Sequence, residues 1–203
     1  MSIAEKCKSA SKSKRLIDAV SSGLHELYYF RAVLYWFKVL TKPPTMEEDG
    51  ETATTSEMKL LRFSNAEDRD VAWCCMASNL FSLFYVTYSS CQVVNSPDLE
   101  FPIDIKGFSS QQKRRFSQLS KHALVDINAN SLIQTRDYSS RGRCYTMKKQ
   151  YFYFKKSKHL IDQIDTALAE HYGFTPEELD FIINYDIKYR MGLGGGSAEE
   201  EDE

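Results

Sequence analysis

The chain has 203 residues, 42% of them hydrophobic, which is enough for a buried core and favours a single domain. Five cysteines without paired spacing, and an N-terminus without a signal peptide, exclude a disulfide-bonded secreted scaffold and predict a cytoplasmic protein with reduced thiols. The formal net charge of −2 hides a basic block, because residues 106–158 hold 13 Lys or Arg and two acids. Such a block indicates a polyanionic partner.

The first third of the chain predicts short elements of both kinds. Residues 1–13 are rich in Lys, Ser and Ala and are expected to form a flexible N-terminus, either disordered or loosely helical, followed by one domain over residues 14–191. Residues 28–40 are aromatic and favour a strand by content, although a helix stays an open alternative. The other expected elements are a helix over 15–24, an acidic, Thr-rich loop over 46–56 and a strand over 58–63.

The middle of the chain predicts two long helices and a strand. Residues 65–88 start with a polar cap and become apolar on nearly all sides, which indicates a buried central helix. Its uncharged run, residues 72–88, is shorter than the ~20 apolar residues of a membrane span, so no membrane partner is expected. Residues 91–105 are irregular, and residues 144–154 predict a strand. Residues 109–133 predict a basic amphipathic helix whose apolar face holds Phe116, Leu119, Ala123, Leu124 and Ile127.

The end of the chain predicts a helical hairpin. Thr175 and Glu178 have the spacing of a capping box at the start of the second helix, and Ile183 lies in its apolar stripe. His171, near the C-terminus of the first helix, is expected to be a cation that the helix dipole favours. The predicted fold is therefore α+β: a small twisted sheet packs on a long buried helix, and a C-terminal helical hairpin closes the domain.

The stretch from Glu178 to Met191 resembles the C-terminal ending of large adenine-specific DNA methyltransferases. These are the single-chain type IIG restriction–modification enzymes and the related BREX-type phage-defence methylases. The resemblance extends over about residues 25–191, with the Asp and Arg of one family element replaced by Ser90 and Gln92. The upstream segments that carry it are Tyr28-Tyr29-Phe30-Arg31, Tyr35-Trp36-Phe37-Lys38, the helix from Ser78 to Tyr85, Ser89 to Gln92, Asn95, and Phe101-Pro102-Ile103. In that family this region is the target-recognition domain, so the resemblance implies recognition of a DNA sequence.

The catalytic half of such an enzyme has no counterpart in this sequence. Pro43 and Pro44 form the single double proline, and they lack the Asn and Tyr of the Asn-Pro-Pro-Tyr-type motif that holds a flipped adenine. The Gly-rich run at 192–196 follows a helix rather than a strand, and it is expected to belong to a flexible Gly-rich and acidic tail over residues 192–203. No catalytic residue, cofactor or metal is therefore expected, and the isolated chain is not expected to be an enzyme.

Two patterns that imitate an active site have simpler explanations. Asp98, Asp104 and Lys106 have the letters of a metal-nuclease motif, but five residues with a proline separate the acids, too few for two strands and a turn. The four histidines are scattered, without metal-ligand spacing or a neighbouring nucleophile. A surface loop is the expected structure around the two acids.

The candidate DNA contacts come from the basic block and from the two aromatic upstream segments. Arginines on a loop suit contacts with base edges, because a guanidinium binds guanine with two hydrogen bonds, and lysines suit contacts with phosphates. The candidates for base contacts are Arg136, Arg141 and Arg143. The remaining candidates are Lys148, Lys149, Lys113, Arg114, Arg31 and Lys38.

The leading hypothesis is a sequence-specific double-stranded DNA recognition module of a restriction–modification or phage-defence adenine methyltransferase. One alternative is the specificity subunit of a split N6-adenine DNA methyltransferase, which becomes active with a catalytic partner chain. The other is a protein-interaction module or DNA mimic that uses the acidic tail.

Overall fold

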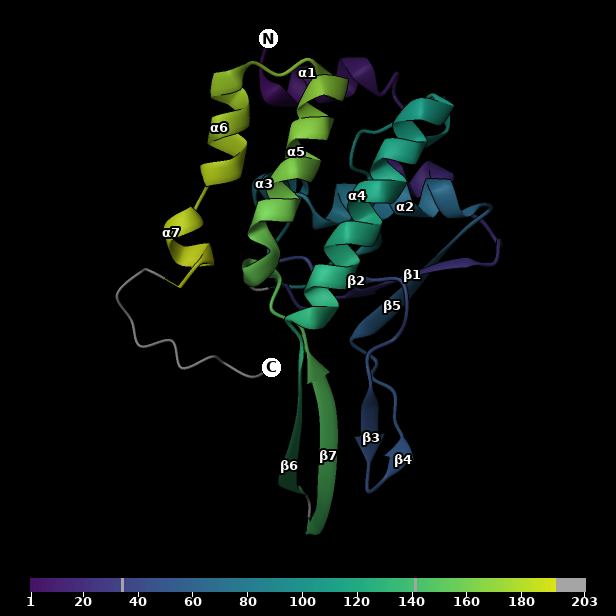
Figure 1. Cartoon of the computed structure of the whole chain (residues 1–203), viewed down its shortest axis with the longest axis vertical. Helices are drawn as coiled ribbons and strands as arrows, with labels where there is room; N and C mark the ends of the chain where they lie inside the picture. The colour runs from purple at the N-terminus through teal and green to yellow at the C-terminus, as the bar shows by residue number, and fades with distance from the viewer. Residues whose placement is uncertain (34, 141, 193–203) are drawn as a thin grey trace.

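The structure is a computed structural model that describes residues 1–33, 35–140 and 142–192. A helical body forms one end of the molecule, and a narrow arm of strands projects from it (Figure 1). The body holds one small antiparallel sheet and the arm holds another, so the predicted α+β class is confirmed. The expected tail falls on residues outside the described ranges, apart from Gly192.

The sheet of the body has three antiparallel strands in the order β2-β1-β5. β1 (His25–Phe30) pairs with β5 (Met58–Phe63) along its whole length, and β2 (Val39–Leu40) pairs with the other edge of β1. The expected strand over 58–63 is confirmed. The expected strand over 28–40 is wrong in its middle, because the chain leaves the sheet after β1 and returns at β2.

The long helix expected over 65–88 is two helices, α2 (Ala66–Ala77) and α3 (Asn79–Tyr88), which meet at an angle of 63°. Ser78 has an extended backbone and its Oγ accepts a hydrogen bond from the Phe81 N–H, so it ends α2 and caps α3. Within the described ranges, no single helix has the length and apolar composition of a membrane span, and this bent pair meets that test jointly.

α2 is the centre of the body, as the sequence predicts. On one side the Trp73 indole donates to the Val39 carbonyl of β2 over 2.9 Å. On another side the Cys74 thiol donates to the Phe116 carbonyl of α4 (Ser110–Ala129). Trp73 and Cys74 are both fully buried. The predicted packing of a small sheet on a buried helix is therefore confirmed, with α4 as a further layer.

The N-terminal segment contains a capped helix, which agrees with the loosely helical alternative for residues 1–13 and not with the disordered one. α1 (Ile3–Ala10) begins with a capping box between Ser2 and Glu5. Lys6 forms an ion pair with Glu178, and Cys7 is buried in the core. Contacts with residues near the C-terminus and with the core thus stabilise this helix, although the composition of the segment does not favour a fixed structure. The helix expected over 15–24 is one 3-10 turn at Leu16–Ala19, and three more such turns lie at Ser96–Leu99, Ile105–Gly107 and Phe154–Ser157.

The C-terminal hairpin is confirmed as α5 (Lys158–Tyr172) and α6 (Pro176–Asn184), with the predicted capping box at the start of α6. The chain then turns at Asp186, where φ is +51°, into the short helix α7 (Ile187–Arg190). Ile182 is 1% exposed, whereas its neighbour Ile183 is half-buried. The centre of the apolar stripe is thus Ile182 and not Ile183.

The arm is a four-stranded antiparallel sheet in the order β4-β3-β7-β6. Its strands are β3 (Met46–Glu48), β4 (Glu51–Thr52), β6 (Leu132–Ser140) and β7 (Arg143–Tyr151). Three expectations are corrected here. The acidic loop over 46–56 contains a hairpin, the basic helix ends at Ala129 rather than near 133, and the strand expected at 144 starts at Arg143.

Candidate nucleic-acid interface

The candidate interface is a ribbon of two strands, β6 and β7, that extends away from the body (Figure 1). Each strand has nine residues, so the ribbon is about 30 Å long at the usual rise of a strand. Side chains on both strands are exposed or half-buried, since the core lies in the body. The major groove of B-DNA admits a two-stranded ribbon, and here the outer edge of β7 also pairs with β3 at Met147 to Lys149.

The pairing register divides the side chains of the ribbon between two faces. Residues directly opposite each other in an antiparallel pair lie on the same face, and the face alternates along a strand. The register pairs Tyr138 with Tyr145 and Thr135 with Lys148. One face, here called the tyrosine face, therefore carries Arg136, Tyr138, Arg143, Tyr145, Lys149 and Tyr151. The opposite face carries Thr135, Asp137, Thr146 and Lys148.

The tyrosine face combines aromatic rings with cations. The rings of Tyr138 and Tyr145 are stacked, with centroids 5.6 Å apart and planes 17° from parallel. The Arg143 guanidinium lies 5.6 Å from the centroid of Tyr145, and the Lys149 ammonium lies 6.0 Å from that of Tyr138. Burial raises the pKa of Tyr151, and Arg136 opposes that shift. The face can therefore offer both donors and flat apolar surfaces to a ligand.

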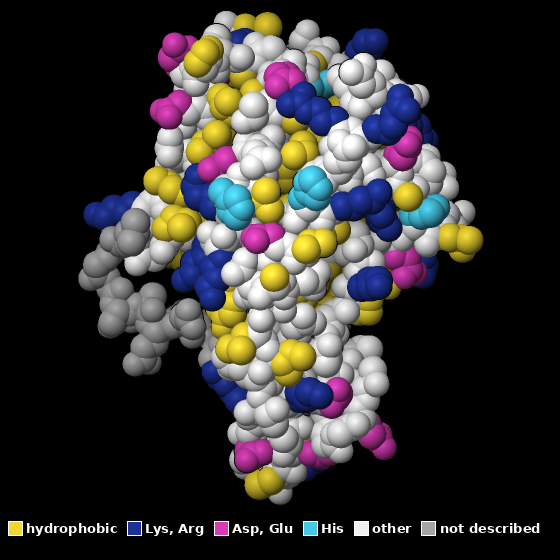
Figure 2. All heavy atoms as spheres, viewed as in Figure 1, with side chains coloured by type: hydrophobic (Ala, Val, Ile, Leu, Met, Phe, Trp, Pro, Cys, Tyr) yellow, Lys and Arg dark blue, Asp and Glu magenta, His cyan; other side chains and the backbone are white. Residues whose placement is uncertain are grey.

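An acidic hairpin lies beside this ribbon and binds two of its cations. β3 pairs with β7 in the register Glu47 to Lys148, and the two side chains form an ion pair of 3.0 Å. At the tip, the Nη2 atom of Arg143 lies 3.0 Å from a Glu48 oxygen and 3.1 Å from an Asp49 oxygen. Side chains of both signs are accordingly visible along the arm in Figure 2.

Asp49 is fixed to β7 by backbone hydrogen bonds as well as by charge. Its carboxylate accepts a hydrogen bond from the Thr146 N–H over 2.8 Å, and its own N–H donates to the Thr146 carbonyl over 2.8 Å. The Thr146 N–H and Arg143 hold the pKa of Asp49 below its usual range. The acids of the hairpin therefore occupy defined positions on the ribbon.

The candidate residues do not form one continuous surface. Arg136 and Arg143 lie on strands and not on the expected loop, and Lys148 and Lys149 point to opposite faces. Arg141 lies outside the described residues. Arg31 and Lys38, both half-buried, lie in the body, in the segment that connects β1 to β2.

Lys113 and Arg114 lie near the start of α4, whereas β6 follows its end. At the rise of an α-helix, Lys113 is roughly 24 Å from the base of the ribbon. Its ammonium lies 2.6 Å from an oxygen of the buried Asp68, which makes Lys113 a structural partner of α2. Arg114 is exposed on α4. The basic block of the sequence is therefore divided between two separate parts of the molecule.

Sequence reasoning missed the contribution of the acidic hairpin. Glu47, Glu48 and Asp49 stand 94 to 101 positions before their cationic partners, so charge counted along residues 106–158 did not include them. The sequence signal for this contact is the opposite charge of two short segments. Residues 47–49 are three consecutive acids, and residues 143–151 contain cations interspersed with tyrosines. Cross-strand pairing of opposite charges is favourable and would place them side by side.

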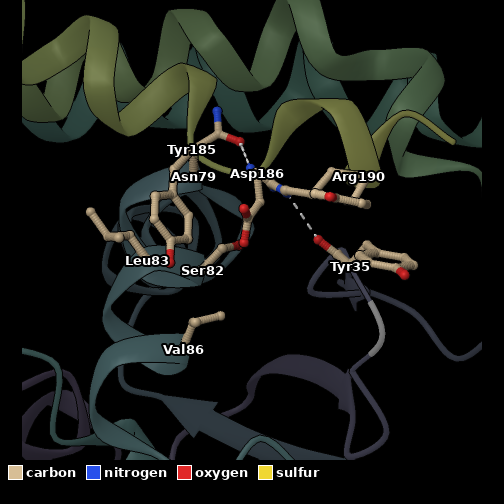
Figure 3. A pocket seen from close by; sticks show the side chains of 9 residues that line it. Tyr35, Asn79, Ser82, Leu83, Val86, Tyr185, Asp186 and Arg190 are labelled. Carbon is tan, nitrogen blue, oxygen red and sulfur yellow. Dashed lines mark hydrogen bonds between the residues drawn. The ribbon is translucent and has the colours of Figure 1, made fainter. Parts of the chain in front are cut away.

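A second feature, in the body, is a buried polar network around Arg190. Its Nη1 donates to the Asn79 side chain over 2.6 Å, and its Nε donates to the Tyr35 carbonyl over 3.1 Å (Figure 3). The guanidinium lies 4.1 Å from the Trp36 ring centroid, and the Trp36 indole donates to the Arg190 carbonyl over 3.0 Å. The network thus connects three segments that are far apart in the sequence, at Tyr35-Trp36, Asn79 and Arg190.

A cavity of about 370 Å³ adjoins this network. Arg190 is 6% exposed, and its Nη2 has no hydrogen-bond partner among the described residues. Burial lowers the pKa of Arg190, and Asp165 opposes that shift. Other lining residues are Tyr35, Asn79, Ser82, Leu83, Val86, Tyr185, Asp186 and Tyr189 (Figure 3). The C-terminal ending therefore has a structural role in joining α7 to α3 and to the loop before β2.

His171 lies at the end of α5, as expected, but its surroundings oppose the positive charge that this position suggested. Its ring stacks on Phe108 with centroids 4.2 Å apart, and burial lowers its pKa. The described residues include no group of three or more His, Cys, Asp or Glu side chains that could hold a metal ion. All five cysteines are free thiols, with Cys91 and Cys144 exposed.

Comparison with known proteins gives no match: no family model, curated protein or solved structure is significantly similar to this chain.

Proposed function

We propose that the chain is a sequence-specific double-stranded DNA recognition module of a restriction–modification or phage-defence adenine methyltransferase, without catalytic activity of its own. The observation that carries the proposal is the projecting β6–β7 ribbon, whose tyrosine face holds three cations among three tyrosines. Side chains of a β-ribbon that lies in the major groove reach base edges. The resemblance of about residues 25–191 to the recognition region and C-terminal ending of adenine-specific DNA methyltransferases supports the same function.

Arg136 and Lys149 are, beside Arg143, the other two cations of the tyrosine face. Arg136 is exposed and its guanidinium suits a base edge, whereas Lys149 suits a phosphate. We assign the base-contacting role to Arg136 and the positioning role to Lys149. Arg143 and Lys148 contribute less, because carboxylates already neutralise them.

The test is a binding-site selection with the full chain on random duplex DNA, followed by anisotropy titrations at rising salt. Arg136→Ala should relax the preference at one base pair at a cost of about 1–3 kcal/mol. Lys149→Ala should weaken binding to all duplexes and flatten the salt slope by about 0.9. Lys121→Ala, which removes the same charge from the exposed face of α4, is the matched control and should change neither quantity appreciably. A parent chain that recovers no consensus would overturn the proposal.

A second candidate is the specificity subunit of a split N6-adenine DNA methyltransferase, and one specific observation favours it. Tyr35, Phe181 and Tyr189 are each more than half exposed, and the first and third of them line the Arg190 cavity. Exposed aromatic clusters rimmed by polar groups are typical of protein interfaces. The test is to add a catalytic chain of a type IIG enzyme that lacks its own recognition region, and to measure methyl transfer to the selected duplex. Transfer that is independent of this chain would exclude the candidate.

A further inference from the structure

The acids of the β3–β4 hairpin have no role in the DNA contacts assigned above. Their carboxylates are nevertheless held in place on the arm by ion pairs and hydrogen bonds. Glu47 binds Lys148 with both oxygens, at 3.0 and 3.2 Å. Glu48 and Asp49 both bind the Nη2 atom of Arg143. Each carboxylate occupies the donors that a DNA phosphate would otherwise use.

We propose that Glu47, Glu48 and Asp49 are specificity-determining residues that suppress sequence-independent binding of DNA by the ribbon. This inference rests on the proposed function. Non-specific affinity comes almost entirely from cations that neutralise phosphates, and it is the same for every sequence. Neutralising two of the cations inside the protein lowers that affinity and leaves base contacts from Arg136 in place. The ratio of specific to non-specific binding therefore rises.

The geometry favours this role over a purely structural one. The hairpin is already attached to β7 by backbone pairing at Met46 to Glu48 and by the Asp49–Thr146 hydrogen bonds. Exposed ion pairs add little stability, typically below about 1 kcal/mol. The side chain of Arg143 is 65% exposed, so its pairing with two acids has a larger effect on a ligand than on folding.

The hairpin also provides a matched control. Glu51 on β4 lies directly opposite Glu48, is exposed, and forms no ion pair with any described residue. Glu51→Gln removes one negative charge from the same hairpin without releasing a cation. Glu47→Gln removes one charge and releases Lys148. A difference between these two variants therefore measures the released cation and not the net charge.

The experiment uses anisotropy titrations of the full chain with two duplexes, one of random sequence and one carrying the consensus from the selection. The triple variant Glu47→Gln, Glu48→Gln, Asp49→Asn should bind the random duplex at least about tenfold more tightly at low salt. Its salt slope should steepen by about 1.8, because two more cations meet phosphates. The consensus duplex should gain less, so that the specificity ratio falls. Glu47→Gln alone should steepen the slope by about 0.9 and should keep the parent melting temperature, which excludes unfolding as the cause.

Two results would overturn this inference while the proposed function stands: an equal effect of Glu51→Gln and Glu47→Gln, or an unchanged ratio in the triple variant. A parent chain without any sequence preference would instead overturn the proposed function. If such a parent bound no duplex but the triple variant did, the suppression of phosphate binding would be supported by itself.

Discussion

Asp165 is the buried side chain on which the start of α3 depends. Its two carboxylate oxygens accept hydrogen bonds from the Asn79 N–H, the Asn79 side-chain amide and the Leu80 N–H, at 2.7 to 3.0 Å. The first N–H groups of a helix have no partner inside the helix, so a carboxylate from another element supplies what α3 lacks. Burial raises the pKa of Asp165 to about 7, although these three donors oppose the shift.

We expect Asp165→Ala to lower the free energy of unfolding by at least about 3 kcal/mol, since it leaves buried donors without an acceptor. Urea denaturation followed by circular dichroism measures the change. The control is Asp162→Ala on the same helix, which removes a half-buried acid whose partners are Lys158 and the Asn79 amide, and should cost about 1 kcal/mol. Equal losses in the two variants would show that the cap contributes no more than an ordinary surface contact.

A second residue-scale prediction concerns pH and His171. Burial lowers the pKa of this imidazole in the folded chain below its ordinary value of about 6.5. The unfolded chain then binds the proton more readily, so folding stability is complete above about pH 6.5 and falls as the pH drops toward the folded pKa. His171→Phe keeps the stacking on Phe108. It also removes the buried Nε2 atom, which has no hydrogen-bond partner among the residues that the structure describes.

The difference in melting temperature between His171→Phe and the parent should therefore grow in favour of the variant as the pH falls from 7.5 to 5. Asp165 changes stability in the opposite sense over this range, because its raised pKa favours the folded state at lower pH. Comparison of two chains that both contain Asp165 removes that contribution. A constant difference across the range would contradict the prediction.

At the scale of elements, α6 closes the body through one side of its surface. Ile182 is buried and Phe181, one position earlier, is 52% exposed. We expect Ile182→Asp to destabilise the protein by more than about 4 kcal/mol, because an unpaired carboxylate would enter the core. Phe181→Asp places the same carboxylate at the neighbouring position and should shift the melting temperature by a few degrees at most. Similar losses in thermal denaturation would mean that α6 packs through both sides.

Local sequence signals were sufficient for elements that carry their own caps or periodicity. Thr175 and Glu178 form the predicted capping box, and Phe116, Ala123 and Ile127 form the buried face of α4. The break at Ser78 was missed because residues 72–88 form one uncharged run that is typical of a single buried helix, and the acceptor that stabilises the break, Asp165, lies on α5. The candidate site was predicted in composition but not in arrangement: the sequence contains the cations, whereas the register separates Lys148 from Lys149 and brings Glu47 to one of them. Contacts between residues far apart in the sequence decide both the break at Ser78 and the arrangement of the candidate site.

At the scale of the whole molecule, the structure allows a prediction about cofactor binding. The body has a packed core around α2, and the described residues contain no glycine-rich loop between a strand and a helix of the kind that holds S-adenosylmethionine. We expect the isolated chain not to bind this cofactor and not to methylate DNA. Calorimetric titration with S-adenosylmethionine is the measurement, and saturable binding at micromolar concentration would contradict it.

The cap that Asp165 provides for α3 also constrains when the chain can fold. Donor and acceptor are 86 residues apart, and the contact of Lys6 with Gly173 spans 167 residues. During synthesis from the N-terminus, α2 and α3 emerge with their apolar surfaces long before α5 exists to cover them and to complete the first turn of α3. Contacts of such separation are closed late and slowly. The nascent chain therefore passes through a prolonged stage of exposed apolar surface, and a transcript truncated before α5 yields a product for proteases and chaperones rather than a smaller stable domain.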